Sequence, residues 1–302
     1  MIIAAGEILV DVFPQYSRMG GAPFNFAYHA KHLGTDVRLI TRVGADETGA
    51  EILSLLEKNG FDTRYIQVDE HRATGRVIVT PDQSGGHDFE ILPDSAYDYI
   101  EFPEMVPDLA ESGANGLVYF GTLAQRTPSG FSRVQAFLDR QKPETRRLYD
   151  INLRRGNFND NTIRESLEKT TILKLNTEEL EYLRNLFAIP GNDPVGLAQW
   201  LITRFGIELV SLTKGAAGSA LITMESHAKI GGTDFEVVDT VGAGDAYAAM
   251  LATGLLRNMP FQEILTLAGE FSAAICRIKG AIPDDPLFYE PFLKQLPGAA
   301  DA

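Results

Sequence analysis

Short apolar runs alternate along the chain with longer segments whose apolar residues recur every three or four positions. Residues 2–10 predict a buried strand that ends at Asp11. Residues 23–33 predict a helix, because Pro23 suits a first turn and Gly34 suits a C-terminal cap. The next segments predict a strand at 37–43, a helix at 47–59 and a strand at 64–68. This alternation predicts a layered α/β fold with a mainly parallel sheet.

The same alternation resumes at residue 116 and continues almost to the C-terminus. Strands are predicted at residues 117–120, 147–151, 172–175, 208–212, 219–222 and 235–238. Helices are predicted at residues 128–140, 162–169, 178–187, 195–205, 243–256 and 261–279. No internal repeat or low-complexity segment interrupts the pattern, so residues 1–302 are predicted to form a single domain.

One segment breaks the alternation. Residues 75–80 and 87–92 are two β-rich runs separated by turn-forming residues, which is typical of a hairpin. Such a hairpin could extend the edge of the sheet, or it could form a flap over a site. Gly20 and Gly21 favour the flap, so we predict a small β lid formed by residues of about 12–19 and 71–98.

The charge balance narrows the possible partners. The chain has 27 Lys and Arg against 41 Asp and Glu, for a net charge of −14, which argues against a nucleic-acid or anionic membrane surface. The single cysteine, Cys276, cannot form an internal disulfide and is expected to be buried. No secretory leader and no apolar run of about 18 residues is seen, so a cytoplasmic protein without a membrane partner is predicted.

The strongest candidate for chemistry lies at residues 237–249, where a strand end passes through a glycine turn into an apolar helix. Free amides of Gly242, Ala243 and Gly244 would suit a phosphate at the start of this helix. Asp245 would then lie beside a transferring phosphoryl group and could accept the proton of an attacking alcohol. In an arbitrary Gly-x-Gly-Asp, however, the aspartate more often only caps the helix and the glycines only make a turn.

Residues 239–245 read Asp-Thr-Val-Gly-Ala-Gly-Asp, which resembles the signature of the ribokinase-like (PfkB) carbohydrate kinases. The resemblance implies an anion hole for the γ-phosphate at the three small residues and a catalytic base at Asp245. Residues 20–27 are similar to the Gly-Gly-Ala-Pro-x-Asn-x-Ala motif in its fructokinase form. By that likeness the sugar is held by Asp11, Gly20, Gly21 and Asn25.

Residues 150–154 resemble the fructokinase-type Asp-Pro-Asn-x-Arg motif, with Ile151 in place of the proline. The resemblance lets Arg154 offset charge on the transferring phosphoryl group. Residues 176–179 resemble the family's Asn-x-x-Glu, which implies that Asn176 contacts the nucleotide and that Glu179 reaches magnesium largely through water. Without the resemblance, Glu179 would be an ordinary first-turn acid that complements the helix dipole.

Residues 213–218 look like the family's Thr-x-Gly-x-x-Gly turn, so Thr213, Gly215 and Gly218 are expected to line the nucleotide. The family also often binds a monovalent cation such as K⁺. Asp239 and residues 279–281 are the candidates for that site.

Together the motifs imply a Rossmann-like three-layer domain with a small β lid and an ATP- and magnesium-dependent sugar kinase. The fructokinase forms of two motifs make D-fructose, phosphorylated to D-fructose 6-phosphate, the first substrate expected. Ribose, 2-keto-3-deoxygluconate and nucleosides stay open, as do a monomer and a homodimer. A sugar sensor without catalysis and a glycosidase are the alternatives from other classes, although a sensor would not need Asp245 and a glycosidase would leave the glycine-rich turn unexplained.

Overall fold

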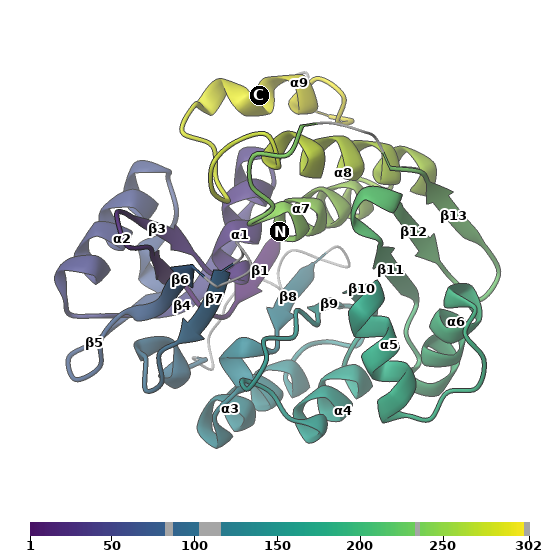
Figure 1. Ribbon diagram of the computed structural model, residues 1–302, viewed down its shortest axis with the longest axis horizontal. Helices are drawn as coiled ribbons and strands as arrows, with labels where there is room; N and C mark the ends of the chain where they lie inside the picture. Colours follow the sequence, from purple (N-terminus) through teal and green to yellow (C-terminus); the bar gives the residue numbers. More distant parts are fainter. Residues whose placement is uncertain (82–86, 103–115, 233–235, 299–302) are drawn as a thin grey trace.

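The computed structural model describes residues 1–81, 87–102, 116–232 and 236–298 (Figure 1). Within these residues the main sheet has nine strands, all parallel except at one edge, where β12 and β13 run antiparallel to their neighbours. In spatial order they are β13 (His227–Ile230), β12 (Ser219–Ile222), β11 (Leu209–Thr213), β10 (Ile172–Asn176), β9 (Arg146–Asp150), β8 (Leu117–Gly121), β1 (Ile2–Ala5), β4 (Val37–Gly44) and β5 (Ile66–Asp69). The prediction of a mainly parallel sheet is confirmed.

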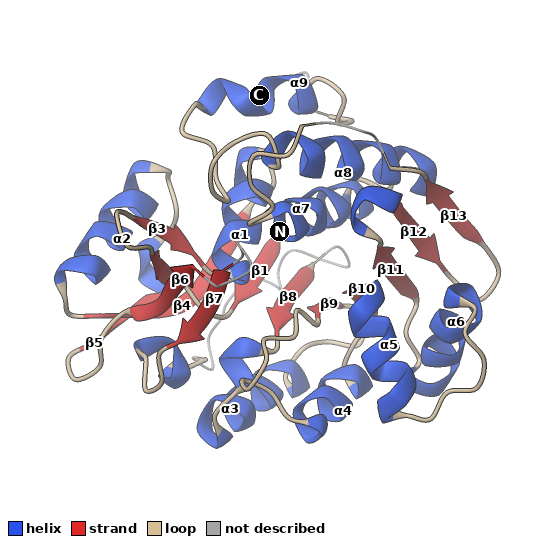
Figure 2. Cartoon of the chain, in the orientation of Figure 1, coloured by secondary structure: helices blue, strands red, loops and turns tan. Residues whose placement is uncertain are grey.

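Helices cover both faces of this sheet (Figure 2). One face carries α1 (Ala22–His32), α2 (Glu47–Lys58), α7 (Ala243–Leu256), α8 (Phe261–Ile275) and the short α9 (Glu290–Leu293). The other face carries α3 (Pro128–Asp139), α4 (Asp160–Glu168), α5 (Thr177–Leu186) and α6 (Pro194–Phe205). Short 3-10 helices are η1 (Thr63–Tyr65), η2 (Ala96–Tyr99), η4 (Leu123–Gln125), η5 (Gly215–Ala217) and η6 (Pro286–Tyr289). The predicted three-layer α/β architecture is therefore present.

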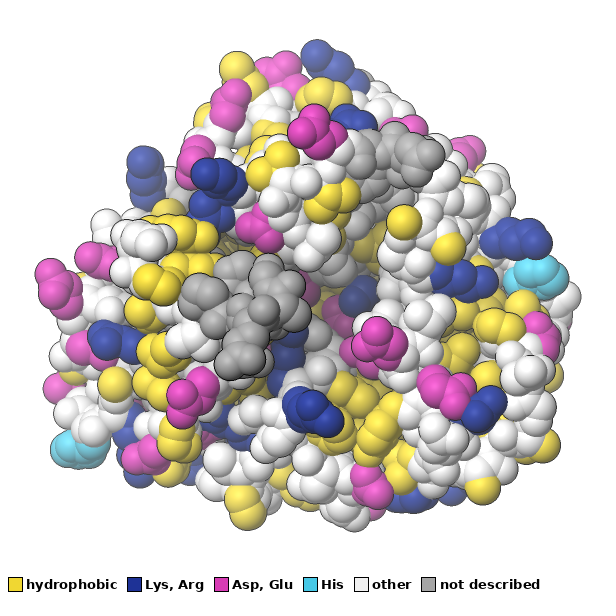
Figure 3. Space-filling model, viewed as in Figure 1, with side chains coloured by type: hydrophobic (Ala, Val, Ile, Leu, Met, Phe, Trp, Pro, Cys, Tyr) yellow, Lys and Arg dark blue, Asp and Glu magenta, His cyan; other side chains and the backbone are white. Residues whose placement is uncertain are grey.

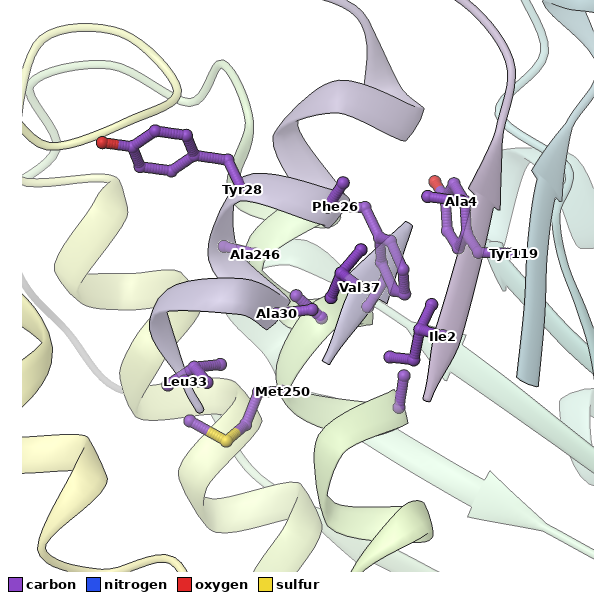
Figure 4. Packing of buried hydrophobic residues seen from close by; sticks show 14 of the residues in the cluster. Ile2, Ala4, Phe26, Tyr28, Ala30, Leu33, Val37, Tyr119, Ala246 and Met250 are labelled. Atoms are coloured by element: carbon purple, nitrogen blue, oxygen red, sulfur yellow. The ribbon is translucent and has the colours of Figure 1, made fainter. Parts of the chain in front are cut away.

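Helix α1 packs against both the sheet and α7 (Figure 4). Phe26 stacks on Tyr119 of β8, with ring centroids 3.8 Å apart, and both side chains are fully buried. On α7 the small side chain of Ala246, also fully buried, lets the two helices approach closely. This packing fixes the first turns of α1 and α7 relative to the sheet, and both turns carry predicted site residues.

The single strand predicted at residues 2–10 is wrong, because the chain bends after Ala5 and divides the segment between two sheets. Ile2–Ala5 forms β1, whereas Leu9–Val12 forms β2 of a second, smaller sheet. Gly6 makes the bend with φ 148°, and a Cβ atom there would lie 2.6 Å from the ring of Pro23. Residues 2–10 are all buried and mostly apolar, so hydrophobicity alone could not reveal the change of sheet.

The small sheet has the strand order β3 (Ser17–Gly20), β2, β6 (Gly75–Pro81), β7 (His87–Ile91). The antiparallel pairing of β6 with β7 confirms the predicted hairpin, whose connecting residues 82–86 lie outside the described part of the chain. Because β6 pairs with β2, the hairpin does not extend the main sheet. The edge-strand alternative is therefore wrong.

Two predictions near the C-terminus also differ from the structure. Residues 236–238, the described part of the predicted strand 235–238, are not a strand, and β13 occupies this edge of the sheet. Helix α8 ends at Ile275, four residues before the prediction, and the carbonyl of Cys276 accepts hydrogen bonds from the amides of Val238 and Asp239. The incoming loop thus uses the carbonyl that a longer helix would have used. Cys276 is buried, as predicted.

The surface agrees with the acidic composition. Figure 3 shows Lys and Arg side chains interspersed with Asp and Glu over the face that it presents, with no basic stripe that could follow a nucleic-acid backbone. None of the described helices combines the length and apolar content needed to cross a membrane.

Candidate active site

The predicted site residues gather at the carboxyl ends of the parallel strands. Asp150 ends β9, Asn176 ends β10 and Thr213 ends β11, and Asn176 and Thr213 are register partners. Strand β1 lies between β4 and β8, so the strand order reverses beside it. Ligands of open α/β sheets bind at this edge and at such a reversal.

The start of α7 provides the candidate anion site. Gly242 adopts φ 78° and packs so closely on Ala281 that a Cβ atom would lie 2.4 Å from the alanine Cβ. The first intrahelical bond runs from the amide of Ala246 to the carbonyl of Gly242, so the amides of Gly244 and Asp245 precede the hydrogen-bonded helix. The amide of Ala243 donates to the carbonyl of Thr240 at 3.3 Å, which is a long bond that a stronger acceptor could replace.

Asp245, the predicted base, lies in the first turn of α7 with only 9% of its surface exposed. Its Oδ2 accepts a hydrogen bond of 2.8 Å from Nδ2 of Asn25, which lies in the first turns of α1. Burial raises the pKa of Asp245 to about 6, with a further increase from Asp150; the Asn25 hydrogen bond, Lys174 and Arg154 oppose this. The structure thus brings together two predicted motifs that lie 220 residues apart in sequence. A carboxylate with a pKa of about 6 can accept a proton near neutral pH.

Lys174 is a site residue that the motifs did not indicate. Its Nζ lies 2.9 Å from each carboxylate oxygen of Asp150, and Tyr119 also donates to this carboxylate at 3.0 Å. The same Nζ is the nearest atom to a Cβ built on Gly244, at 3.4 Å. Burial lowers the pKa of Lys174, but Asp150 and Glu179 outweigh burial and the pKa is raised. A lone lysine inside the apolar run 172–175 was the signal that could have identified it.

Glu179 and Asn176 form a reciprocal cap at the start of α5. Oδ1 of Asn176 accepts from the amide of Glu179 at 2.9 Å, and Oε2 of Glu179 accepts from the amide of Asn176 at 2.8 Å. Oε1 of Glu179 accepts from the amide of Leu153 at 3.0 Å. Because both carboxylate oxygens already have amide partners, they suit a water-mediated contact with magnesium better than direct coordination. The magnesium role of Glu179 stays a prediction.

The loop after β9 departs from the family pattern at Ile151. The amide of Ile151 donates to the carbonyl of Lys174 at 3.2 Å, a bond that a proline could not make. Asn152 follows in the left-handed region with φ 37°. Arg154 lies two residues later and is exposed. Its positive charge lowers the pKa of Asp11 and the pKa of Asp245. Arg154 is therefore within electrostatic reach of the candidate base.

The predicted sugar-binding residues lie where the two sheets meet. Asp11 of β2 is so close to Gly20 that a Cβ atom there would lie 2.8 Å from Oδ2 of Asp11. Burial raises the pKa of Asp11 to about 6, although Arg154 opposes the rise. Gly21 precedes α1 and has φ 108°. A Cβ atom on Gly21 would lie 2.6 Å from the carbonyl oxygen of Glu7. Asp11, Gly20, Gly21 and Asn25 thus surround one junction.

Gly21→Ala is expected to lower the free energy of unfolding by about 2 kcal/mol or more, because the new Cβ adds a clash with a backbone carbonyl to the cost of a positive φ. Gly191→Ala is the matched control, since Gly191 has φ 84° and no atom within 4 Å of its Cβ position. Urea unfolding of both variants measures the difference. Equal losses would show that the junction accommodates a methyl group.

The predicted nucleotide-lining turn connects β11 to β12. Gly215 has φ 55° and Gly218 has φ 95°, and a Cβ atom on Gly218 would lie 2.1 Å from the carbonyl of Ile230. The amide of Lys214 donates to the carbonyl of Gly218 at 2.8 Å and closes the turn. The backbone at Gly218 thus packs closely on the backbone at Ile230, near Thr213. A turn with such close packing requires glycine.

Asp239, the candidate for a monovalent cation, already has several partners. Its Oδ1 accepts from the amide of Val241 at 3.0 Å, its Oδ2 accepts from the amide of Gly280 at 2.9 Å, and Arg18 of β3 lies 3.8 Å from Oδ2. These neighbours make its side chain poorly suited to a cation, so that site stays a prediction from the resemblance. In the described ranges, no group of three His, Cys, Asp or Glu residues could hold a metal ion.

Comparison with known proteins identifies the family. The family model described as pfkB family carbohydrate kinase matches residues 8–287. A protein of Pyrococcus horikoshii described as an uncharacterized sugar kinase is 30% identical over 275 residues, which cover 85% of this chain and 83% of that protein. Fructokinase-2 of Solanum lycopersicum is 26% identical over 312 residues and covers 95% and 93% of the two chains.

Solved structures agree with this result. The Pyrococcus horikoshii protein in complex with ATP superposes with a TM-score of 0.78 at 26% identity, over 93% of this chain and 94% of that chain. A fructokinase of Vibrio cholerae O395, bound to fructose, ADP and calcium, has a TM-score of 0.80 at 22% identity and supports the fold, over 96% and 97% of the two chains. The family match and the sequence relatives show that this chain is a sugar kinase and belongs to the pfkB family of carbohydrate kinases.

Proposed function

We propose that the protein transfers the γ-phosphate of ATP to a sugar hydroxyl, with D-fructose as the first substrate and D-fructose 6-phosphate as the product. The observation that carries this proposal is the hydrogen bond from Asn25 to Asp245. It supports the proposal because a residue expected to hold the sugar contacts the residue expected to act as the base. The ATP bound to the Pyrococcus horikoshii relative supports ATP as the phosphoryl donor.

In the proposed reaction, Asp245 accepts the proton of the sugar hydroxyl as that oxygen attacks the γ-phosphorus. The amides of Gly242, Ala243 and Gly244 stabilise charge on the phosphoryl oxygens. Lys174, whose ammonium lies beside Gly244, adds a buried positive charge, and Arg154 adds an exposed one. Lys174 and Asp245 are held by Asp150 and Asn25 before the substrate arrives, so these two side chains need little reorganisation during the transfer.

The nucleotide is proposed to lie along Asn176, Thr213, Gly215 and Gly218, at the ends of β10 and β11. Magnesium bound to its phosphates, and reached by Glu179 through water, would neutralise part of their charge. The small sheet is proposed to act as a lid of a single domain and to exclude water from the sugar, which would limit hydrolysis of ATP.

Measuring ADP release with magnesium, ATP and a panel of sugars tests the proposal. D-fructose, D-ribose, 2-keto-3-deoxygluconate and adenosine cover the substrate classes that stay open. The largest kcat/KM with D-fructose would support the fructokinase assignment, and a larger value with another compound would replace it. Sugar binding without ADP release would instead favour a sensor, and cleavage of a glycoside would favour a hydrolase.

The pH dependence of kcat/KM is expected to include the titration of Asp245, together with that of Asp11, and the Asn25→Ala variant separates the two. The carboxylate must be deprotonated to act as a base, so kcat/KM should fall as the pH drops below about 6. Asn25→Ala removes a hydrogen bond that lowers the pKa of Asp245, so the acid limb should move to higher pH. Initial rates between pH 5 and 8 measure both profiles.

Asp193→Asn is the control for this experiment, because Asp193 is exposed and caps α6 through the amide of Gly196. Its acid limb should coincide with that of the unmodified protein. If the acid limb of Asn25→Ala lies at the same pH as that of the unmodified protein, the limb does not report the titration of Asp245.

A further inference from the structure

A buried carboxylic acid at the junction of the two sheets has no role in the reaction described above. Glu7 follows the bend at Gly6, between the end of β1 and the start of β2. Its side chain is 4% exposed, and its Oε2 is buried without a hydrogen-bond partner among the described residues. A buried acceptor without a donor is costly, so native structures rarely keep one unless a ligand or water completes it.

The surroundings of Glu7 link this carboxyl group to the candidate site. Burial raises the pKa of Glu7 to about 7, and the negative charge of Asp245 raises it further. The pKa is lowered by hydrogen bonds from the Glu7 amide and the Ala22 amide and by the positive charge of Arg154. From the other elements that surround it, Tyr97, Tyr119 and Arg126 also interact electrostatically with Glu7. The carbonyl oxygen of Glu7 lies 2.6 Å from the position of a Cβ atom on Gly21, so Glu7 packs against the start of α1. Its carboxyl group is within electrostatic reach of the candidate base and of Arg154.

Asn25 presents a second acceptor of the same kind. Its Nδ2 donates to Asp245, but its Oδ1 is buried and has no partner in the described part of the chain. Glu7 and Asn25 thus each have one side-chain oxygen without a hydrogen-bond partner among the described residues. Asn25 donates a hydrogen bond to Asp245, and Glu7 interacts with Asp245 electrostatically. Both unpaired acceptors need hydrogen-bond donors, and the hydroxyl groups of a sugar are donors.

We propose that Glu7 is a sugar-binding residue, which accepts a hydrogen bond from a hydroxyl next to the one that Asp245 deprotonates. This inference rests on the proposed function, because it names a further specificity residue of the same site. Carboxyl groups at Glu7, Asp11 and Asp245 together would favour a neutral polyol over a sugar acid or a sugar phosphate. A site that hydrogen-bonds a particular hydroxyl rejects analogues that lack it, because the buried acceptor is then left unpaired.

Glu7→Gln tests the proposal, with D-fructose or D-ribose as the sugar, whichever gives the higher kcat/KM in the unmodified protein. The substitution keeps the size of the side chain and removes its charge. The kcat/KM for the sugar is expected to fall by about 10- to 100-fold, with the KM for ATP within about twofold of the original value. Asp193→Asn, the same kind of acid-to-amide change at the exposed cap of α6, should leave both constants unchanged.

Monodeoxy derivatives of the same sugar then locate the contact. One derivative should lose most of its kcat/KM with the unmodified protein but little more with Glu7→Gln, because the missing hydroxyl and the altered acid are partners. A structural role would not produce this coupling. If Glu7→Gln does not fold, Glu7→Asp takes its place, since it keeps the charge and shortens the reach.

A kcat/KM within twofold of the original in Glu7→Gln, or equal losses for every deoxy sugar in both proteins, would overturn the proposal. The proposed function fails separately, if the unmodified protein releases no ADP with any sugar. In that case calorimetric titration of D-fructose and D-ribose decides the question: weaker binding by Glu7→Gln supports the contact, and unchanged or absent binding overturns it.

Discussion

Asp245→Asn is expected to lower kcat by about 10²-fold or more, because an amide cannot accept the proton of the attacking hydroxyl. The substitution is nearly isosteric, and the new side-chain oxygen can still accept the hydrogen bond from Asn25. The start of α7 should therefore keep its structure, and the affinities for sugar and nucleotide should change much less than kcat. Steady-state kinetics together with calorimetric titration of both ligands separates the two effects.

The control is Asp193→Asn, which changes an acid to an amide at the exposed cap of α6. It should cost stability of about 1 kcal/mol or less and leave kcat unchanged. Turnover of Asp245→Asn near that of the unmodified protein would remove Asp245 from the mechanism. A large loss of ligand affinity would instead give this residue a binding role.

Local pattern predicted α7 well. The bounds 243–256 agree with the structure, because a glycine in the left-handed region precedes a long apolar run with small residues. The paired strands of the hairpin were likewise predicted from residues close in sequence. Features of this kind depend on turn and helix preferences, which a sequence displays directly.

The change of sheet at Gly6 and the strand β13 were not predicted. Apolar residues on β1 and β2 look alike in sequence, although one strand pairs with β4 and β8 and the other with β3 and β6. Strand β13 alternates between exposed and half-buried residues, so its apolar signal is weak. In both cases pairing over long distances decides the outcome, and local periodicity does not encode the partner.

In the candidate site, too, the sequence predicts single residues, whereas the contacts between them depend on the fold. The motifs named Asn25 and Asp245 separately, but only the fold shows their hydrogen bond. His29, one turn after Asn25, is fully buried, and its two ring nitrogens bond to the hydroxyl of Tyr289 and the carbonyl of Ala281, each at 2.9 Å. Burial lowers the pKa of His29 to about 3, so its ring is neutral. Because Ala281 packs on Gly242, α1 holds the start of α7 at two points.

Lys174→Met is expected to impair both stability and turnover. Removing the ammonium leaves the buried carboxylate of Asp150 with Tyr119 as its one side-chain donor among the described residues. Breaking such a pair costs about 3–5 kcal/mol in the free energy of unfolding. Because the ammonium lies beside Gly244, its loss should also remove charge stabilisation from the transferring phosphoryl group. A fall in kcat of about 10²-fold is expected.

The double variant Lys174→Met with Asp150→Asn separates these effects. The asparagine can still accept the hydrogen bond from Tyr119 and carries no charge, so most of the lost stability should return, as urea unfolding would measure. Turnover should stay low, because no positive charge has been restored beside the anion site. If kcat recovers together with stability, Lys174 acts only as the partner of Asp150. If stability recovers alone, a lysine that no motif indicated contributes directly to phosphoryl transfer.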